Sequence, residues 1–443
     1  MPADHQGYRG AVLQLLRATG VEIGDIVRVK KEHVDYEGVL MPRYELADDE
    51  HITLKLKNGY NIGILATERV TIEKTGEGAK PAFSLPSRLK EKPGLPTVAI
   101  ISTGGTIASR VDYRTGAVRP ALSASDLASI VPELSEIANV RAEILYSMLS
   151  ENIHSPHWSK LAQTVASFTR EDVDGVVICH GTDTLAYTAS ALSFALQNIP
   201  VPVILVGSQR SSDRPSSDAH MNLLNAVTAA ARLPCAGVMV GMHETTSDTS
   251  TVLHLGTKVR KCHTSRRDAF RSVNAMPVAR IEGQRITLLH EMLPSRDKSR
   301  NVVVKSEFDE NAALLKFFPG IRPELVKWFV DNGYKGLILE GTGLGHIATY
   351  LLDEVRSAVA KGLVIGMTSQ CLWGRVNMNV YDTGVYLQKA GVFPLEDMLP
   401  ETALVKMMWC LSQSKERETI IQLMKTNIAG EISPRSLPQE TSP

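Results

Sequence analysis

The hydrophobic pattern of this sequence changes near Pro96, and the change constrains the fold on each side of it. Before Pro96, polar and apolar residues alternate over residues 25–30, 51–57 and 69–74, which is typical of strands with one buried face. After Pro96, continuous apolar runs alternate with helical stretches, which is typical of parallel strands buried on both faces. The clearest of these runs are residues 98–101, 176–178, 203–206 and 238–240. The sequence therefore predicts a small all-β part followed by a larger α/β part.

The pattern divides the chain into six predicted segments. The alternating runs, with Asn58-Gly59 as a hairpin turn between two of them, predict a small SH3-like β-barrel. A stretch rich in Gly, Pro, Ser and Lys follows, as in a linker. The segments are an N-terminal helix or extension (1–20), the barrel (21–75), the linker (76–96), a catalytic domain (97–290), a connection (291–322) and a C-terminal α/β domain (323–443).

The composition argues against several classes of protein. Among the 443 residues, Lys plus Arg and Asp plus Glu each number 48, without the basic excess of proteins that grip nucleic acid alone. If RNA is involved, another subunit is expected to hold it. No run approaches the roughly 20 apolar residues of a membrane span, and residues 1–10 do not resemble a secretory signal. We interpret the five scattered cysteines as buried residues in a reducing environment and expect a cytoplasmic protein.

Three predicted strands end in polar turns that contain glycine. The first turn is Thr103-Gly104-Gly105-Thr106, the second is His180-Gly181-Thr182-Asp183-Thr184, and the third is Gly207-Ser208-Gln209-Arg210. The carboxyl ends of parallel strands are where α/β sheets bind ligands, and glycine lets backbone N–H groups approach a ligand closely. One such turn alone is more often structural than functional, and the first turn lacks the P-loop pattern. The three turns together predict an oxyanion site with threonine hydroxyls beside it.

These turns resemble the signature segments of the L-asparaginase family. The similar segments are residues 103–108 and 180–184 (its two signatures), Ser150-Glu151-Asn152 (its substrate-carboxylate segment) and residues 207–210 (its third loop). Lys261 matches its catalytic lysine, and the similarity extends over residues 97–425. The resemblance implies an α/β fold with a larger and a smaller domain, an intimate homodimer, and amide hydrolysis by threonine nucleophiles.

The resemblance also assigns catalytic roles. It implies that Thr106 attacks the side-chain amide carbon of the substrate, and that Thr182, Asp183 and Lys261 form a second catalytic group. A threonine hydroxyl needs a base to take its proton, and a lysine can serve if desolvation or a cationic neighbour favours its neutral form. Which threonine attacks in which step stays open.

Four further residues are expected to bind substrate, namely Ser150, Glu151, Ser208 and Tyr113. Tyr113 lies in the polar segment 109–120, which resembles the mobile lid of the family; an ordinary surface loop is the alternative. Residues 341–346 resemble the loop by which one protomer reaches the site of its dimer mate. His346 stands where the family commonly has asparagine, so a role for His346 stays open.

Within the family, three features resemble the glutaminase subunits of archaeal glutamyl-tRNA(Gln) amidotransferases. They are the barrel before the hydrolase, the segment 261–270 and the segment 374–381. This resemblance implies a partner, the E-type subunit of the amidotransferase, that holds the tRNA and amidates Glu-tRNA(Gln) with ammonia from this chain. Nothing in the sequence resembles an ATP site, so we expect no cofactor in this chain and ATP and Mg²⁺ in the partner.

Two other functions remain open from the sequence: a free-standing cytoplasmic L-asparaginase, and a catalytically silent amino-acid-binding or scaffold subunit. The threonine and lysine residues weigh against the silent subunit. His154 and His157 lack a third ligand nearby in the sequence, so we predict no metal site. The preference for glutamine or asparagine, the route of ammonia and the role of the barrel also stay open.

Overall fold

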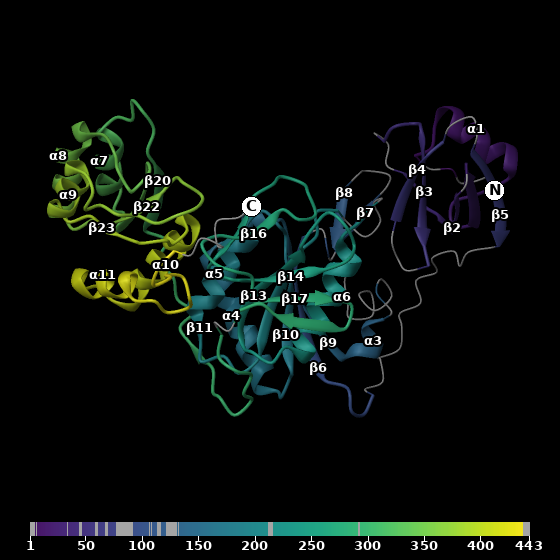
Figure 1. Cartoon of the computed structure of the whole chain (residues 1–443), viewed down its shortest axis with the longest axis horizontal. Helices are drawn as coiled ribbons and strands as arrows, with labels where there is room; N and C mark the ends of the chain where they lie inside the picture. Colours follow the sequence, from purple (N-terminus) through teal and green to yellow (C-terminus); the bar gives the residue numbers. More distant parts are fainter. Residues whose placement is uncertain are drawn as a thin grey trace.

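The computed structural model describes residue 5 and residues 7–32, 34–43, 47–57, 61–66, 70–76, 92–105, 107, 109–112, 117–120, 131, 133–210, 216–290 and 293–436. Thr106, Tyr113, the Asn58-Gly59 turn and most of the predicted linker lie outside the described residues. Figure 1 shows an N-terminal β domain, a central α/β domain and a C-terminal α/β domain in chain order along the long axis. Among the described helices, none is long and apolar enough to cross a bilayer.

The N-terminal domain is an antiparallel sheet with the strand order β4-β3-β2-β1-β5. Its elements are α1 (Gly10–Thr19), β1 (Ile26–Lys31), β2 (Val34–Leu40), β3 (His51–Leu56), β4 (Asn61–Leu65) and β5 (Val70–Gly76). The alternation in β1 buries Val27 and Val29, which pack with Leu16 of α1 in a core of their own. The predicted small β domain is therefore confirmed.

The central domain is built on an eight-stranded sheet with the order β18-β17-β14-β13-β12-β10-β6-β9. Its first strands are β6 (Thr97–Gly104), β9 (Asn139–Met148), β10 (Gly175–Cys179), β12 (Pro202–Val206) and β13 (Gly237–His243), which pair in parallel. The antiparallel extension is β14 (Thr251–Leu255), β17 (Ala279–Glu282) and β18 (Arg285–Leu288). The continuous apolar runs thus form the buried strands that the sequence predicts.

Helices cover both faces of this sheet. One face packs against α3 (Leu134–Ile137) and α6 (Ala219–Arg232), and the other against α4 (Ser155–Arg170) and α5 (Leu185–Ala195). The chain runs from β6 to β9 on one side and then to β10 on the other, which makes the gap between β6 and β10 the switch point of the sheet. Ligands bind at the carboxyl ends of strands beside such a point. The remaining elements are β7 (Ser109–Asp112), β8 (Ala117–Pro120), η2 (Ser150–Asn152), β11 (Leu196–Gln197), β15 (Val259–Lys261) and β16 (Phe270–Ser272).

The C-terminal domain has a smaller parallel sheet with the order β20-β21-β22-β23. Its strands are β20 (Ala312–Lys316), β21 (Gly336–Gly341), β22 (Val364–Ser369) and β23 (Phe393–Pro394). Before them, β19 (Val303–Val304) pairs with β11 of the central domain. Its helices are α7 (Glu324–Asp331), η3 (Thr349–Leu351), α8 (Leu352–Ala360), α9 (Asp382–Lys389), α10 (Pro400–Gln413) and α11 (Arg417–Lys425). The predicted fold class, two α/β domains after a small β domain, is confirmed.

A buried polar seam joins the two α/β domains. Lys258 Nζ lies 2.6 Å from Asp397 Oδ2, and the two side chains are 0% and 1% exposed. Asn274 donates to the Gly374 carbonyl and accepts from the Gly374 N–H, each at 2.9 Å. The Ser433 N–H donates to the second Asp397 oxygen at 2.9 Å. Because each buried charge or amide in this domain seam has a partner across it, the seam fixes one domain against the other.

Candidate active site

The first turn packs directly onto its neighbours because it contains glycine. Gly104 and Gly105 have φ of 103° and 80°, which a residue with a Cβ rarely adopts. A Cβ on Gly105 would lie 2.4 Å from the Gly181 nitrogen, and one on Gly104 would lie 2.5 Å from the Met148 carbonyl oxygen. The turn that leads into Thr106 is therefore held against the second turn, at the switch point between β6 and β10.

The second turn is enclosed on two further sides. The Thr184 hydroxyl donates to the Ser150 carbonyl at 2.6 Å, which holds η2 beside the turn. From the opposite side, Gly207 of the third turn comes so close that a Cβ there would lie 2.8 Å from the Thr182 methyl group. Three strand ends and η2 thus converge on Thr182, as the glycine pattern predicts.

Lys261 completes this group from outside the central sheet. It is the last residue of β15, which pairs with β16 through Lys261 and Phe270. Its ammonium donates to the Thr182 hydroxyl at 2.9 Å and to Asp183 Oδ1 at 2.8 Å. The structure thus brings Thr182, Asp183 and Lys261 into mutual contact, although 79 positions separate Thr182 from Lys261 along the chain.

This contact has the geometry of a nucleophile, a base and a residue that orients the base. A base must lie within hydrogen-bond reach of the proton it takes, and a third group commonly fixes its direction. Thr182 is only 6% exposed and the Lys261 side chain 14%, whereas the Asp183 side chain is 61% exposed. A neutral Lys261 amine in this position can accept the Thr182 proton. The turn also leads into α5, and a helix N-terminus favours a developing negative charge.

Several polar groups at this edge are buried without a partner. Among the described side chains, the hydroxyls of Ser208 and Ser102 and the Nε2 group of Gln209 make no hydrogen bond. Buried polar groups are normally paired, and a ligand is one way to pair them. Ser208 lies next to Gly207, which touches Thr182, so its hydroxyl suits substrate binding. Ser150, at 2% exposed, donates to the Glu151 carboxylate at 3.2 Å, which places both predicted residues at the same edge.

His180 supports the second turn from below. Its Nδ1 lies 2.7 Å from the Gly181 carbonyl oxygen and its Nε2 lies 2.9 Å from the Thr188 hydroxyl, which accepts from Trp158 Nε1. Since a carbonyl only accepts, Nδ1 donates and Nε2 accepts, as in a neutral imidazole. Complete burial lowers the pKa of His180 to about 4, which keeps the ring neutral near pH 7. Sequence reasoning noted His180 only as part of a turn.

The third turn is held by Asp218, which sequence reasoning missed. The Asp218 carboxylate accepts from the backbone N–H groups of Gln209 and Arg210, each at 3.0 Å. Burial raises the pKa of Asp218, and these N–H groups and His243 offset part of that effect. Its position just before α6 is a helix-start signal, but that signal does not reveal the contact with residues 209 and 210.

The structure does not bring every predicted residue to this edge. Residues 109–112 and 117–120 of the segment predicted as a lid form an antiparallel pair, β7–β8, while Tyr113 between them is outside the described residues, as is Thr106. His346 lies in the C-terminal domain, where its Nδ1 is 3.2 Å from the Thr383 hydroxyl and its ring meets that of Tyr381 edge to face.

Other reactive groups have structural surroundings. His154 Nδ1 lies 2.8 Å from Glu310, and no group of three His, Cys, Asp or Glu residues in the described part of the chain is arranged to hold a metal. Cys179, Cys235 and Cys410 are buried. Cys262 and Cys371 are exposed, so the prediction of burial is wrong for these two, which follow β15 and β22 in surface turns.

Comparisons with known proteins cover almost the whole chain. Residues 97–294 match the N-terminal asparaginase family and residues 311–424 match the glutaminase/asparaginase C-terminal domain family. Residues 21–74 match the GatD N-terminal domain family. All three described domains therefore have a counterpart among known families.

Full-length relatives share about half of their residues with this chain. It is 49% identical over 431 residues to the D-type subunit of glutamyl-tRNA(Gln) amidotransferase from Metallosphaera sedula, covering 97% of each chain. It is 50% identical over 436 residues to the protein of the same name from Pyrococcus furiosus, covering 96% of this chain and 98% of that one.

Two solved structures that resemble the chain are L-asparaginases. The thermostable L-asparaginase from Thermococcus kodakarensis superposes with a TM-score of 0.68 at 34% identity, covering 76% of this chain and 99% of that one. L-asparaginase I from Vibrio cholerae gives a TM-score of 0.67 at 30% identity, with the same coverage.

Proposed function

This chain belongs to the glutaminase/asparaginase family, and on that premise we propose that it is the glutaminase subunit of a glutamyl-tRNA(Gln) amidotransferase. It is an amide hydrolase that works within a ligase complex. The observation that carries this function is the full-length similarity to D-type subunits of that enzyme, which includes the N-terminal β domain and covers 97% of both chains in one case. The L-asparaginase structures, in contrast, cover 76% of this chain.

Threonine nucleophiles account for the release of ammonia. A threonine oxygen bonds to the side-chain amide carbon of glutamine, the C–N bond breaks, and ammonia leaves with the former hydroxyl proton. Water then attacks the resulting ester, which releases glutamate and restores the hydroxyl. We assign the nucleophilic steps to Thr106 and Thr182, without deciding their order. The contact of Lys261 with Thr182 and Asp183 supports its role in moving the proton.

Binding of the substrate falls to the groups that converge on Thr182. Ser150, Glu151 and Ser208 hold the α-amino and α-carboxylate groups of the substrate, which the unpaired Ser208 hydroxyl supports. We assign Tyr113 to contact with the bound amino acid, as the family resemblance implies. This chain needs no cofactor for these steps, because the hydrolysis uses only hydroxyl, amine and carboxylate groups.

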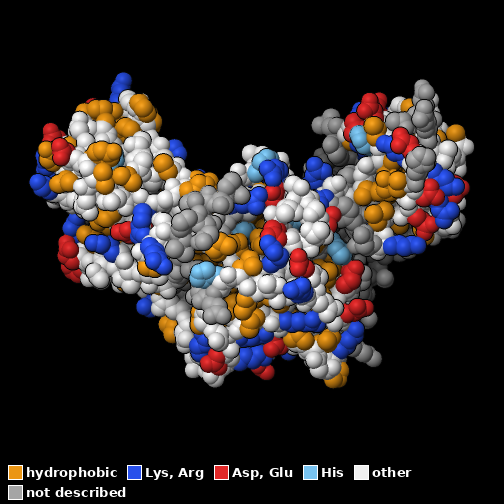
Figure 2. Space-filling view, viewed as in Figure 1, with side chains coloured by type: hydrophobic (Ala, Val, Ile, Leu, Met, Phe, Trp, Pro, Cys, Tyr) orange, Lys and Arg blue, Asp and Glu red, His pale blue; other side chains and the backbone are white. Residues whose placement is uncertain are grey.

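The chain works with a partner subunit in the amidotransferase. We assign ATP, Mg²⁺ and most of the contact with tRNA to that partner, the E-type subunit, and propose that this chain forms a homodimer. The equal numbers of basic and acidic residues support this division, since tRNA binding favours a basic surface. On the face shown in Figure 2, Lys and Arg side chains are interspersed with Asp and Glu side chains.

Reconstitution tests this function. The chain is purified with and without the E-type partner, and ammonia release from glutamine and from asparagine is measured with and without Glu-tRNA(Gln). We expect slow hydrolysis by the chain alone and a large stimulation by the loaded partner, because ammonia released into water at neutral pH is mostly protonated and lost as a nucleophile. Thr182→Ala in the same complex is the control. Full-speed hydrolysis of asparagine by the chain alone would instead identify a free-standing L-asparaginase.

A further inference from the structure

Two side chains of the α6 region hold the third turn from beneath. Asp218 accepts from the N–H groups of Gln209 and Arg210, and Asn222 donates from Nδ2 to the Gly207 carbonyl at 3.0 Å and to Asp218 Oδ2 at 3.2 Å. Asp218 and Asn222 are both 0% exposed. The third turn is therefore fixed at three backbone positions by side chains that lie at or near the start of α6.

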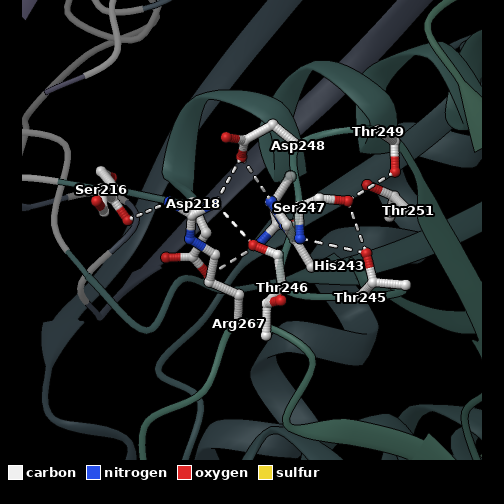
Figure 3. Close-up of polar contacts among 12 residues, drawn as sticks. Ser216, Asp218, His243, Thr245, Thr246, Ser247, Asp248, Thr249, Thr251 and Arg267 are labelled. Atoms are coloured by element: carbon white, nitrogen blue, oxygen red, sulfur yellow. Dashed lines mark hydrogen bonds and ion pairs between the residues drawn. The ribbon is translucent and has the colours of Figure 1, made fainter. Parts of the chain in front are cut away.

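His243 connects this support to a neighbouring loop. It is the last residue of β13 and is 0% exposed. Its Nδ1 lies 2.6 Å from Asn222 Oδ1. Its Nε2 lies 3.1 Å from Asp248 Oδ1 (Figure 3), so both ring nitrogens face acceptor oxygens, and a neutral ring donates to one of them. The loop between β13 and β14 is thereby tied to α6 through one imidazole ring.

Arg267 extends the chain of contacts to the hairpin that carries Lys261. Its guanidinium donates to Asp248 Oδ1 at 2.9 Å, to the Thr246 carbonyl at 3.2 Å and to the Ser216 carbonyl at 3.0 Å (Figure 3). Arg267 lies in the connection from β15 to β16, and β15 ends at Lys261. One guanidinium therefore contacts the segment before α6 and the β13–β14 loop from within the Lys261 hairpin.

We propose that Asp218, Asn222, His243, Asp248 and Arg267 form a positioning relay that sets the third turn and the Lys261 hairpin at a fixed distance from Thr182. The proposal deepens the function given above, since it concerns the same site. The relay residues bond to backbone groups of the turn and to one another, so they act through Ser208 and Lys261. The third turn touches the Thr182 methyl group, as a Cβ on Gly207 would lie 2.8 Å from it, so a small shift of this turn reaches the nucleophile.

The relay also explains why a fully buried histidine and a largely buried arginine occur beside a surface loop. Burial lowers the pKa of Arg267, so its charge carries a desolvation cost, and Asp248 lies 2.9 Å from the guanidinium. Misplacement of reacting groups by about 1 Å lowers rates by roughly 10²-fold. A relay that bridges two separately folded loops is a physical means of preventing such a shift.

The test compares substitutions of two histidines, His243 in the relay and His220 on α6 outside it. His243→Leu removes both relay contacts, while His243→Asn keeps a donor near Nδ1 for Asn222 but gives up Asp248. His220 has a side chain that is 17% exposed, and its Nε2 lies 3.2 Å from Glu133. Amide hydrolysis is measured in the full complex with both glutamine and asparagine. We expect kcat to fall about tenfold or more in His243→Leu and less in His243→Asn, and to change less than about twofold in His220→Asn.

A double-mutant cycle separates positioning from loss of stability. If the relay acts through the third turn, the effect of His243→Asn on kcat shrinks when Ser208→Ala is already present, because that turn has lost its substrate contact. Three results would overturn the relay. They are independent effects of His243→Asn and Ser208→Ala on kcat, equal losses of kcat in the His243 and His220 variants, or kcat within twofold of wild type in both His243 variants. Wild-type hydrolysis of asparagine but not glutamine would refute the proposed function while the relay remained measurable.

Discussion

Lysine and other polar side chains lie both at the carboxyl edge of the catalytic sheet and in the domain seam. They differ between the two regions in their exposure to solvent and in their partners. Lys258 and Lys261 are three positions apart in one segment. Lys258, 0% exposed, is paired with Asp397 inside the seam, whereas Lys261, 14% exposed, contacts Thr182 and the largely exposed Asp183. In the seam, Asn274 also donates to the Asp397 carbonyl across the domain boundary.

The difference distinguishes polar contacts that hold two domains together from polar groups that can bind a ligand. In the seam, the buried polar side chains find partners within the protein. At the sheet edge, the hydroxyls of Ser208 and Ser102 and the amide of Gln209 are buried without one. An unpaired buried polar group costs about 1–3 kcal/mol, so a substrate that pairs these groups would recover part of that cost. Lys258 is thus expected to hold the fold, and Lys261 to act on the substrate.

We expect the largest effect from the substitution Lys261→Arg, and we expect it on the rate of amide hydrolysis. A guanidinium stays protonated and cannot take a proton from Thr182, so we expect amide hydrolysis to fall by roughly 10²–10⁴-fold. The midpoint of unfolding should remain near that of wild type, because the lysine is not part of the seam. Steady-state rates across pH and a thermal melt measure both quantities. A wild-type pH–rate profile in this variant would contradict the role of Lys261.

The reverse result is expected for Lys258→Met. Removing one member of a buried pair leaves Asp397 without its counter-charge, which costs about 3–5 kcal/mol of unfolding free energy. Activity per folded molecule should change only a few-fold. Denaturant unfolding measures the loss, and the double variant Lys258→Met with Asp397→Leu should recover part of it. Full stability with lost activity would mean that the seam lysine, too, serves the chemistry.

Acidification tests two buried histidines, His180 beneath the second turn and His254 away from it. Burial lowers the pKa of His180 to about 4 and that of His254 to about 3, from 6.5. The unfolded chain therefore binds protons more readily, so stability is fully present above about pH 6.5 and falls as the pH drops towards 4. Between its unfolded and folded pKa values, each histidine lowers the free energy of unfolding by about 1.4 kcal/mol for each pH unit of acidification. Denaturant midpoints between pH 7 and pH 5 measure the slope, which His254→Asn should roughly halve. A flat profile would contradict this expectation.

The smallest expected effect is that of removing residues 1–90. The N-terminal domain packs around Leu16 and Val27 in its own core, separate from the cores of the α/β domains. One described contact across the boundary is the Ser216 N–H to the Asn61 carbonyl. We expect the truncated chain to be folded, with a melting temperature within about 5 °C of the α/β transition of the full chain. An insoluble product would place the domain boundary elsewhere.

The sequence predicted those features that depend on local pattern. The continuous apolar run 203–206, for example, lies in β12. The glycines at 104 and 105 were sufficient to predict a close-packed turn. The resemblance added Lys261, which spacing alone does not associate with Thr182. The catalytic and substrate-binding roles of these residues remain predictions.

The features that were missed depend on long-range pairing. Lys258 and Asp397 are 139 positions apart, and nothing in the local sequence marks either as buried. His243 is followed by an exposed polar loop, so its complete burial was not evident, and the relay through Asp248 and Arg267 depends on how two loops fold together. Local periodicity carries no information about such pairs.

Capture of the covalent intermediate tests most directly whether a threonine hydroxyl attacks the amide. The complex turning over glutamine is quenched in acid within milliseconds, and its peptides are analysed by mass spectrometry. We expect a glutamyl ester on the peptide that contains Thr106 or Thr182, and we expect it to disappear when that threonine is replaced by alanine. An adduct on a cysteine, or undiminished ammonia release in both Thr106→Ala and Thr182→Ala, would contradict the claim that threonine hydroxyls at this sheet edge hydrolyse the amide.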